Sequence, residues 1–170
     1  LVAAPTDVNS RRLPNEESFN VELDDTNLWS LNRYAGDDRV EGGVHADYGL
    51  RLAWYGAGGA NASAFLGQSY RLTRESDFGA GTGLDRQASD LVGRLSVSPH
   101  QYFDAYYRFR VDEEGFAFKR HELTLNAGPQ AVRVGLNYTF VGGVGEFDER
   151  QEIAARFDSR ITDAWRFTAN

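Results

Sequence analysis

Hydrophobic and polar residues alternate along most of the chain, and the alternation is clearest between Arg39 and Tyr55. One set of alternate positions includes Val44, Tyr48, Leu52 and Trp54, and the other includes His45, Asp47 and Arg51. Successive side chains of a β-strand point to opposite faces of the sheet. The stretch therefore predicts one long strand with an apolar face and a charged face.

The same period of two returns in later segments, which lie at 60–72, 89–98, 102–111, 119–127, 131–141, 150–161 and 165–169. Turns rich in Gly, Pro and Asp separate them, and we expect one such turn at Pro99 and His100. The pattern predicts an all-β fold in which about eight strands form an antiparallel up-and-down meander, part of a transmembrane β-barrel or of a soluble one.

Residues 1–38 are polar and rich in turn-forming residues, and they predict a long connection. A short alternation around Phe19 to Leu23 predicts one brief strand within it. A helical turn is expected after a cap at Asp25 or Thr26. The chain thus divides into a loop-rich connection over 1–38 and the strands of a barrel over 39–170.

The connections between the strands alternate in length. Those at 56–59, 99–101, 128–130 and 162–164 are short, whereas those at 73–88, 112–119 and 142–149 are long. In an antiparallel meander this places all short turns at one end and all long loops at the other. The same asymmetry is typical of outer-membrane barrels, whose short turns face the periplasm.

The medium that touches the apolar face decides the class of function, and the alternation leaves several classes open. The apolar face lines a soluble, lipocalin-like barrel that holds an apolar ligand, or it faces lipid in a translocon or porin-type channel. A third class is an outer-membrane enzyme. Aromatic residues near strand ends favour lipid, because Tyr and Trp side chains suit a membrane interface. They are Trp54, Tyr55, Tyr102, Phe103 and Trp165.

In a transmembrane barrel the two faces of each strand have different surroundings. We expect the lipid-facing positions to include Val44, Tyr48, Leu52, Trp54, Phe109, Leu125, Leu136 and Phe157. We expect the polar face to line a wet lumen and to include Asp47, Arg51, Arg71, Arg94, Arg108, Arg110, Arg133 and Arg156. Guanidinium groups bind phosphate oxygens well, so the luminal arginines are candidates for attracting lipid phosphates.

Composition narrows these alternatives. The net charge of −7 argues against a nucleic-acid partner, because no Lys/Arg patch is present to neutralise phosphates. The absence of Cys excludes disulfides and thiolate metal sites within this stretch. No apolar run reaches the roughly 20 residues that a membrane-spanning helix needs. Because the chain begins at Leu1 and ends at Asn170 within a predicted strand, we expect it to be a piece of a longer protein.

No motif specifies catalysis, a cofactor or a metal, and we expect the chain not to be an enzyme. The histidines lack metal-ligand spacing and are interpreted as polar surface residues; they are His45, His100 and His121. The glycine-rich stretch at 79–83 lacks the spacing of a phosphate-binding loop. The acidic run at 16–25 lacks the pattern of a calcium loop and is interpreted as solvated.

One block of the chain carries a resemblance to a known family. It contains Pro14, Asn15, Glu16 and Ser18, then Asn27 and Leu28, and then Arg33, Gly36, Asp38 and Arg39 in the pattern Arg-Tyr-x-Gly-x-Asp-Arg. Further along, residues 67–70 contain Gly-Gln-x-Tyr. Together these segments resemble the LptD family of lipopolysaccharide-assembly outer-membrane proteins, also called organic solvent tolerance proteins.

The resemblance implies a fragment from the C-terminal half of a large barrel in the bacterial cell outer membrane. Its implied function is the insertion of lipopolysaccharide into the outer leaflet. The implied partners are lipopolysaccharide, outer-membrane lipid, an LptE-like plug lipoprotein and periplasmic bridge proteins. The lateral gate of the family barrel, formed by its first and last strands, is expected to lie outside this segment.

Reversing Arg108 and Arg110 to Glu in the full-length protein tests the role of the luminal arginines. The expected result is weaker lipopolysaccharide export, because carboxylates at these positions would repel the lipid phosphates. The measurement is the amount of lipopolysaccharide on the surface of intact cells. Unchanged export would contradict the idea.

Overall fold

The structure is a computed structural model that describes residues 1–5, 9, 21–34, 39–73, 76, 78–129, 131–143, 149–160, 162 and 165–170. The brief strand expected around Phe19 to Leu23 begins outside these residues, and its described part, 21–23, is not a strand. The helical turn expected after Asp25 or Thr26 is replaced by a series of turns over 25–29. Asp24, rather than either predicted residue, caps them, because its Oδ1 accepts hydrogen bonds from the backbone N–H groups of Thr26 and Asn27 at 2.7 and 2.9 Å.

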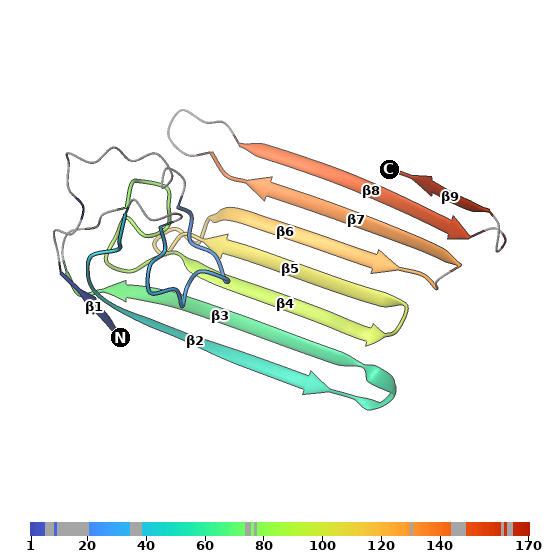
Figure 1. The fold of residues 1–170 in the computed structure, drawn as a ribbon, viewed down its shortest axis with the longest axis horizontal. Helices are drawn as coiled ribbons and strands as arrows, with labels where there is room; N and C mark the ends of the chain where they lie inside the picture. The colour runs from blue at the N-terminus through green and yellow to red at the C-terminus, as the bar shows by residue number, and fades with distance from the viewer. Residues whose placement is uncertain are drawn as a thin grey trace. The chain divides into compact units, whose positions relative to one another are not determined.

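The strands within the described residues form one sheet in which neighbours follow chain order, from β1 to β9 (Figure 1). They are β1 (Val2–Ala4), β2 (Gly43–Tyr55), β3 (Asn61–Arg71), β4 (Leu91–His100), β5 (Phe103–Val111), β6 (Phe118–Ala127), β7 (Val132–Val141), β8 (Arg150–Arg160) and β9 (Arg166–Ala169). A short 3-10 turn, η1 (Ala57–Gly59), joins β2 to β3. The predicted all-β antiparallel meander is confirmed, and β1 is an addition that the sequence pattern did not indicate.

Most strand boundaries lie within two residues of the predictions, and two of the differences have a clear physical reason. β2 begins at Gly43 instead of Arg39, and Gly43 has a φ of +87°, a conformation that glycine adopts at little cost. β4 runs through Pro99 to His100, so the turn predicted at these two residues is wrong. Proline is tolerated near the end of a strand because the φ of its ring is close to extended values and only one ladder donor is lost.

The chain divides into two compact units, which are described separately. The first contains Leu1–Leu50, Leu66–Val92 and Arg110–Ala117. The second contains Arg51–Phe65, Gly93–Phe109 and Phe118–Asn170. The described residues contain no helix with the length and apolarity needed to cross a membrane.

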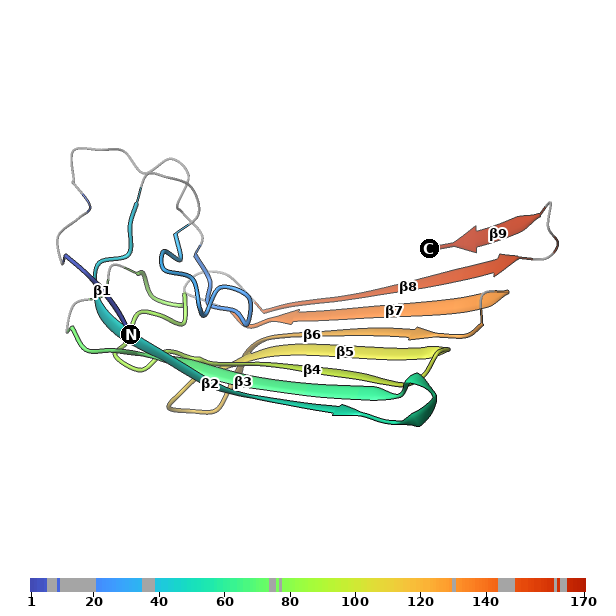
Figure 2. The same cartoon turned by 60° about the horizontal axis from the view of Figure 1, so that its bottom comes forward.

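The first unit has a core formed by its connecting segments instead of by the apolar face of its strands. In Figure 2 the segment 21–34 lies over one face of the sheet, above the beginning of β2. Its backbone joins the loop after β3, since the Leu23 N–H donates to the Thr82 carbonyl at 2.9 Å. The rings of Tyr34 and Phe78 stack with centroids 4.7 Å apart. Buried apolar residues of this unit are Val21, Leu23, Leu28, Tyr34, Phe78, Leu84, Val92 and Val111.

The second unit shows the alternation of faces through its strand register. Leu136 on β7 lies between Leu125 on β6 and Ala155 on β8. The next position along β7 is Asn137, which points to the opposite face because successive side chains alternate. Apolar and polar residues therefore form separate rows across β6, β7 and β8, as the sequence pattern predicts.

A glycine interrupts the apolar row on β4. A Cβ atom added to Gly93 would clash with the Cζ atom of Phe109. The Phe109 ring therefore lies directly over the β4 backbone and fills the space of the missing side chain.

The apolar face of the strands is exposed in both units. In the first unit Tyr48 is 50% exposed and Leu50 is 61% exposed, and in the second unit Leu52 is 59% exposed and Ile153 is 70% exposed. The opposite face of β2 carries His45, which is only 1% exposed. Apolar surface of this extent marks contact with lipid or with another protein.

Placing one charge on either face of β7 tests what the apolar face contacts. In the full-length protein reconstituted in lipid vesicles, Leu136→Arg is expected to cost about 2–4 kcal/mol, because its charge enters the hydrocarbon. Asn137→Arg is the matched control, one residue away on the polar face, and is expected to cost little. Urea unfolding followed by tryptophan fluorescence measures both, and equal costs would contradict a lipid-facing position for Leu136.

Candidate functional site

Polar side chains from three parts of the first unit meet beneath the segment 21–34. They are Arg33 of that segment, Glu41 just before β2, His45 and Asp47 on β2, and Ser69 and Arg71 on β3. The side chains of Arg33 and Glu41 are fully buried. We call this set the buried charge network. The period-two alternation places its β2 and β3 members on the polar face, opposite the exposed apolar residues.

Arg33 is the centre of the buried charge network. One terminal nitrogen, Nη1, donates to the Oε1 atom of Glu41 at 2.8 Å. The other, Nη2, donates to the Asp47 carboxylate, to the Leu28 carbonyl at 3.0 Å and to the Ser69 hydroxyl at 3.2 Å. A single guanidinium thus joins the connecting segment to β2 and β3, which the planar fork of arginine suits well.

Arg71 provides the second positive charge of the network. Its Nη2 donates to the same Oε1 atom of Glu41 at 3.0 Å, and its Nη1 donates to the Gly42 carbonyl at 2.9 Å. Its guanidinium carbon also lies 5.6 Å from the centre of the Phe78 ring, within the range of a cation–π contact. Arg71 therefore connects the polar face of β3 both to Glu41 and to the apolar core.

The two guanidinium groups balance the Glu41 and Asp47 carboxylates. Burial raises the pKa of the Glu41 carboxyl above its ordinary value, and the nearby charges of Arg33 and Arg71 act in the opposite direction. Asp47 has an additional donor, because the Ser69 hydroxyl donates to its Oδ1 at 2.6 Å. Loss of either arginine would leave a carboxylate buried without full compensation.

His45 lies between the two carboxylates. Its Nδ1 is 3.5 Å from Glu41 Oε1, and its Nε2 is 3.5 Å from Asp47 Oδ2. Neither ring nitrogen has a hydrogen-bond partner among the described residues. The interpretation of this histidine as a surface residue is wrong, because the segment 21–34 covers this end of β2. Within the described ranges, no group of three or more His, Asp or Glu side chains is arranged to hold a metal ion.

Arg110 on β5 makes a second connection to the same segment. Its Nη2 lies 2.8 Å from a Glu22 carboxylate oxygen, and its Nη1 donates to the Thr82 carbonyl at 2.9 Å. The Asp90 carboxylate lies 3.5 Å from its Nε. Only 3% of its side chain is exposed, so Arg110 acts first as a packing residue of the first unit. Its reversal to Glu would disturb this packing as well as the polar face.

The remaining residues predicted for the lumen have more exposed surroundings. Arg108 lies 3.7 Å from Glu122, Arg133 lies 3.6 Å from Asp104, and Arg156 lies 2.7 Å from Asp158. Arg51 is exposed on β2, and Arg94 is half-buried on β4. The structure brings Asp47 and Arg71 into one network and leaves these five arginines outside it. Their luminal position stays a prediction.

The residues predicted to face lipid divide by exposure. Tyr48, Leu52, Trp54 and Phe157 are exposed, whereas Val44, Phe109, Leu125 and Leu136 are half-buried. Half-burial is expected for residues in the middle of a sheet, because neighbouring strands contribute side chains to the same face. Contact of these residues with lipid stays a prediction as well.

The described residues of the motif block have structural roles. Leu28 is completely buried, and Asn27 closes a turn by accepting from the Asp24 N–H at 2.9 Å and donating to the Glu22 carbonyl at 2.8 Å. Arg33 holds the network together, and the Arg39 carbonyl accepts a hydrogen bond from the Asn32 amide at 2.9 Å. Outside the described residues lie Pro14, Asn15, Glu16, Ser18, Gly36 and Asp38.

Three residues of the buried charge network were not predicted as site residues from the sequence: Glu41, His45 and Ser69. A signal was present, because Glu41, His45 and Asp47 alternate along one face of a single stretch. Their burial, however, depends on the segment 21–34, which folds onto that face through contacts that alternation does not describe.

An antiparallel meander with a charged face covered by its own connecting segment and an apolar face exposed has the properties of an outer-membrane barrel wall. A comparison with protein families matches residues 1–170 to LptD, described as LPS transport system D. Because the match spans the whole chain, the chain belongs to the LptD family, in agreement with the resemblance of its motif block. Proteins of this family are outer-membrane components of lipopolysaccharide transport. No curated protein matched the chain.

Replacing Arg33 tests whether the network holds the connecting segment in place. In the full-length protein, Arg33→Met is expected to cost about 3–5 kcal/mol of local stability, since Glu41 and Asp47 lose their shared partner in a buried position. Hydrogen–deuterium exchange should then become faster in peptides covering 21–34 and 43–47.

Arg39→Met is the matched control, because it removes the same group from a nearby position outside the network. It is expected to leave exchange in these peptides almost unchanged. Equal exchange in the two variants would show that Arg33 does not hold the segment.

Proposed function

We propose that this chain forms part of the wall of an outer-membrane translocon that inserts lipopolysaccharide into the outer leaflet. The observation that carries the proposal is the family match over residues 1–170. Lipopolysaccharide combines acyl chains with a phosphorylated saccharide, so a passage for it needs an apolar outer wall and a polar interior. The chain acts as a transport protein in this proposal and not as an enzyme.

The exposed apolar face supports this assignment. Leu52 and Trp54 are 59% and 60% exposed on β2, where a soluble protein would normally cover such residues. Contact with lipid is favourable for such residues because it removes their apolar surface from water. We therefore assign this face to the outer-membrane lipid.

The buried charge network supports a polar interior on the other face. The segment 21–34 is held against that face by the Arg33 contacts with Glu41 and Asp47 and by the ion pair between Arg110 and Glu22. Both contacts lie near the long-loop end of their strands. We infer that the segment narrows the interior at the outer rim, so that lipopolysaccharide leaves sideways toward the leaflet.

The resemblance to the family also supplies partners. We propose that the polar face encloses a plug lipoprotein in the full barrel and that periplasmic bridge proteins deliver the lipid from the short-turn side.

Depletion of the full-length protein in living cells tests the proposed function. The expected result is a several-fold decrease in newly made lipopolysaccharide at the cell surface, with an increase inside the envelope, because the last transport step is lost. Pulse labelling of the saccharide followed by surface capture measures it. The surface level of an unrelated porin over the same interval is the control. Unchanged surface lipopolysaccharide at full depletion would refute the proposal.

A further inference from the structure

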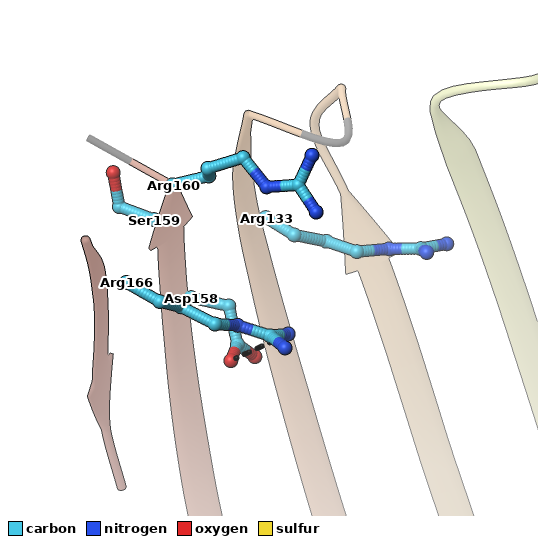
Figure 3. Close-up of a pocket in the computed structure, with 5 residues that line it drawn as sticks. All are labelled: Arg133, Asp158, Ser159, Arg160 and Arg166. Carbon is cyan, nitrogen blue, oxygen red and sulfur yellow. Dashed lines mark hydrogen bonds and ion pairs between the residues drawn. The ribbon is translucent and has the colours of Figure 1, made fainter. Parts of the chain in front are cut away.

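A hollow of about 230 Å³ lies on the second unit near the short-turn end of β7, β8 and β9 (Figure 3). It is lined by Arg133, Asp158, Ser159, Arg160 and Arg166. Three of these five residues carry a guanidinium group and one carries a carboxylate. The hollow therefore has an excess of positive charge, on a chain whose net charge is −7.

The strand register places like charges directly opposite each other at this hollow. Arg133 on β7 is paired with Asp158 on β8, a complementary arrangement. Arg160 on β8 is paired with Arg166 on β9. Like charges in directly opposed positions destabilise a sheet, and an anion bound between them would offset this repulsion. The pairing thus indicates a place for an anion.

The carboxylates among the described residues do not balance this charge. Asp158 accepts from Arg156 Nε at 2.7 Å and from the Thr168 hydroxyl at 3.1 Å, and its contact with Arg166 is 3.5 Å long. Arg133 has a 3.6 Å contact with Asp104. Among the residues that the structure describes, the guanidinium of Arg160 has no carboxylate partner. Within the described ranges, four arginines and two aspartates give this region an excess of two positive charges.

We propose that this hollow binds a phosphate monoester. Such a group carries a charge of about −1.5 to −2 near neutral pH, which matches the excess charge of the arginines. Its oxygens accept paired hydrogen bonds from guanidinium groups, whereas a single carboxylate would neutralise only half of the excess. In Figure 3 the side chains of Arg133 and Arg160 extend in the same direction from neighbouring strands.

This assignment deepens the proposed function and rests on it for the source of the phosphate. The hollow lies beside the short turns, which face the periplasm in outer-membrane barrels. Lipopolysaccharide arriving from the periplasm would meet it first, so the ligand is a phosphate of the lipopolysaccharide. Free inorganic phosphate has the same chemistry, and the experiment below separates the two sources.

The test compares ligands on the full-length protein purified in detergent. The probes are phosphorylated lipopolysaccharide, the same lipopolysaccharide after enzymatic removal of its phosphates, and inorganic phosphate alone. The wild-type protein is expected to bind the phosphorylated form about tenfold more tightly than the dephosphorylated form, the ratio expected for one charged hydrogen-bond pair. In the double variant Arg160→Gln, Arg166→Gln this preference should disappear.

The matched control is the double variant Arg51→Gln, Arg150→Gln, which removes the same charge from polar-face positions outside the hollow. It should keep the preference of the wild-type protein. A further variant, Arg166→Lys, keeps the charge but loses the guanidinium fork, and should bind with intermediate preference. The gel mobility of unheated samples confirms that each variant forms a folded barrel.

Each outcome decides the proposal. If only the Arg160 and Arg166 variant loses the preference for phosphorylated lipopolysaccharide, the hollow binds a phosphate of the lipid. If the wild-type protein binds inorganic phosphate tightly and shows no preference between the two lipopolysaccharides, the hollow binds free phosphate. A preference that survives in this variant, or that is lost equally in the control, overturns it. Phosphate binding by a protein whose depletion leaves surface lipopolysaccharide unchanged would refute the proposed function and retain the site.

Discussion

Burial of the Glu41 and Asp47 carboxylates is the constraint on which the first unit depends. Removing two carboxylates from water is costly, and the cost is offset only when cations reach them with good geometry. Arg33 does so from the connecting segment and Arg71 from β3. Because Arg33 also donates to the Leu28 carbonyl, the same interaction fixes the turn that brings Leu28 into the core. The connecting segment, the core and the polar face are therefore stabilised together.

The sheet could be predicted from the sequence because alternation is a local property. Each strand from β2 to β9 was found by its own period of two, and the antiparallel order follows from short and long connections. Two of the errors arise at single residues that depart from the general rule: Pro99 continues a strand, and Gly43 begins one later than alternation indicates. Residue propensities describe how proline and glycine behave on average, whereas the neighbouring strands of the sheet determine the conformation at Pro99 and Gly43.

The candidate site was less predictable because partner choice depends on register and on loops. Arg110 and Arg160 look equivalent in the sequence, since both lie on the polar face of an alternating strand. In the structure Arg110 is enclosed by Glu22, Asp90 and the Thr82 carbonyl, whereas Arg160 is opposed by Arg166. The first arrangement serves packing and the second leaves charge for a ligand. The roles of the two arginines differ because of the residues paired with them on the neighbouring strand and because of the segment that folds over Arg110.

The Phe109 ring over Gly93 has a consequence for the backbone beneath it. A glycine in a strand normally leaves its peptide groups open to the surrounding medium, and on a lipid-facing wall that would expose polar atoms to hydrocarbon. The ring covers this gap from the neighbouring strand. The ring thereby fills the space above the sheet that a side chain at position 93 would occupy. Glycine and phenylalanine here work as one hydrophobic unit shared by β4 and β5.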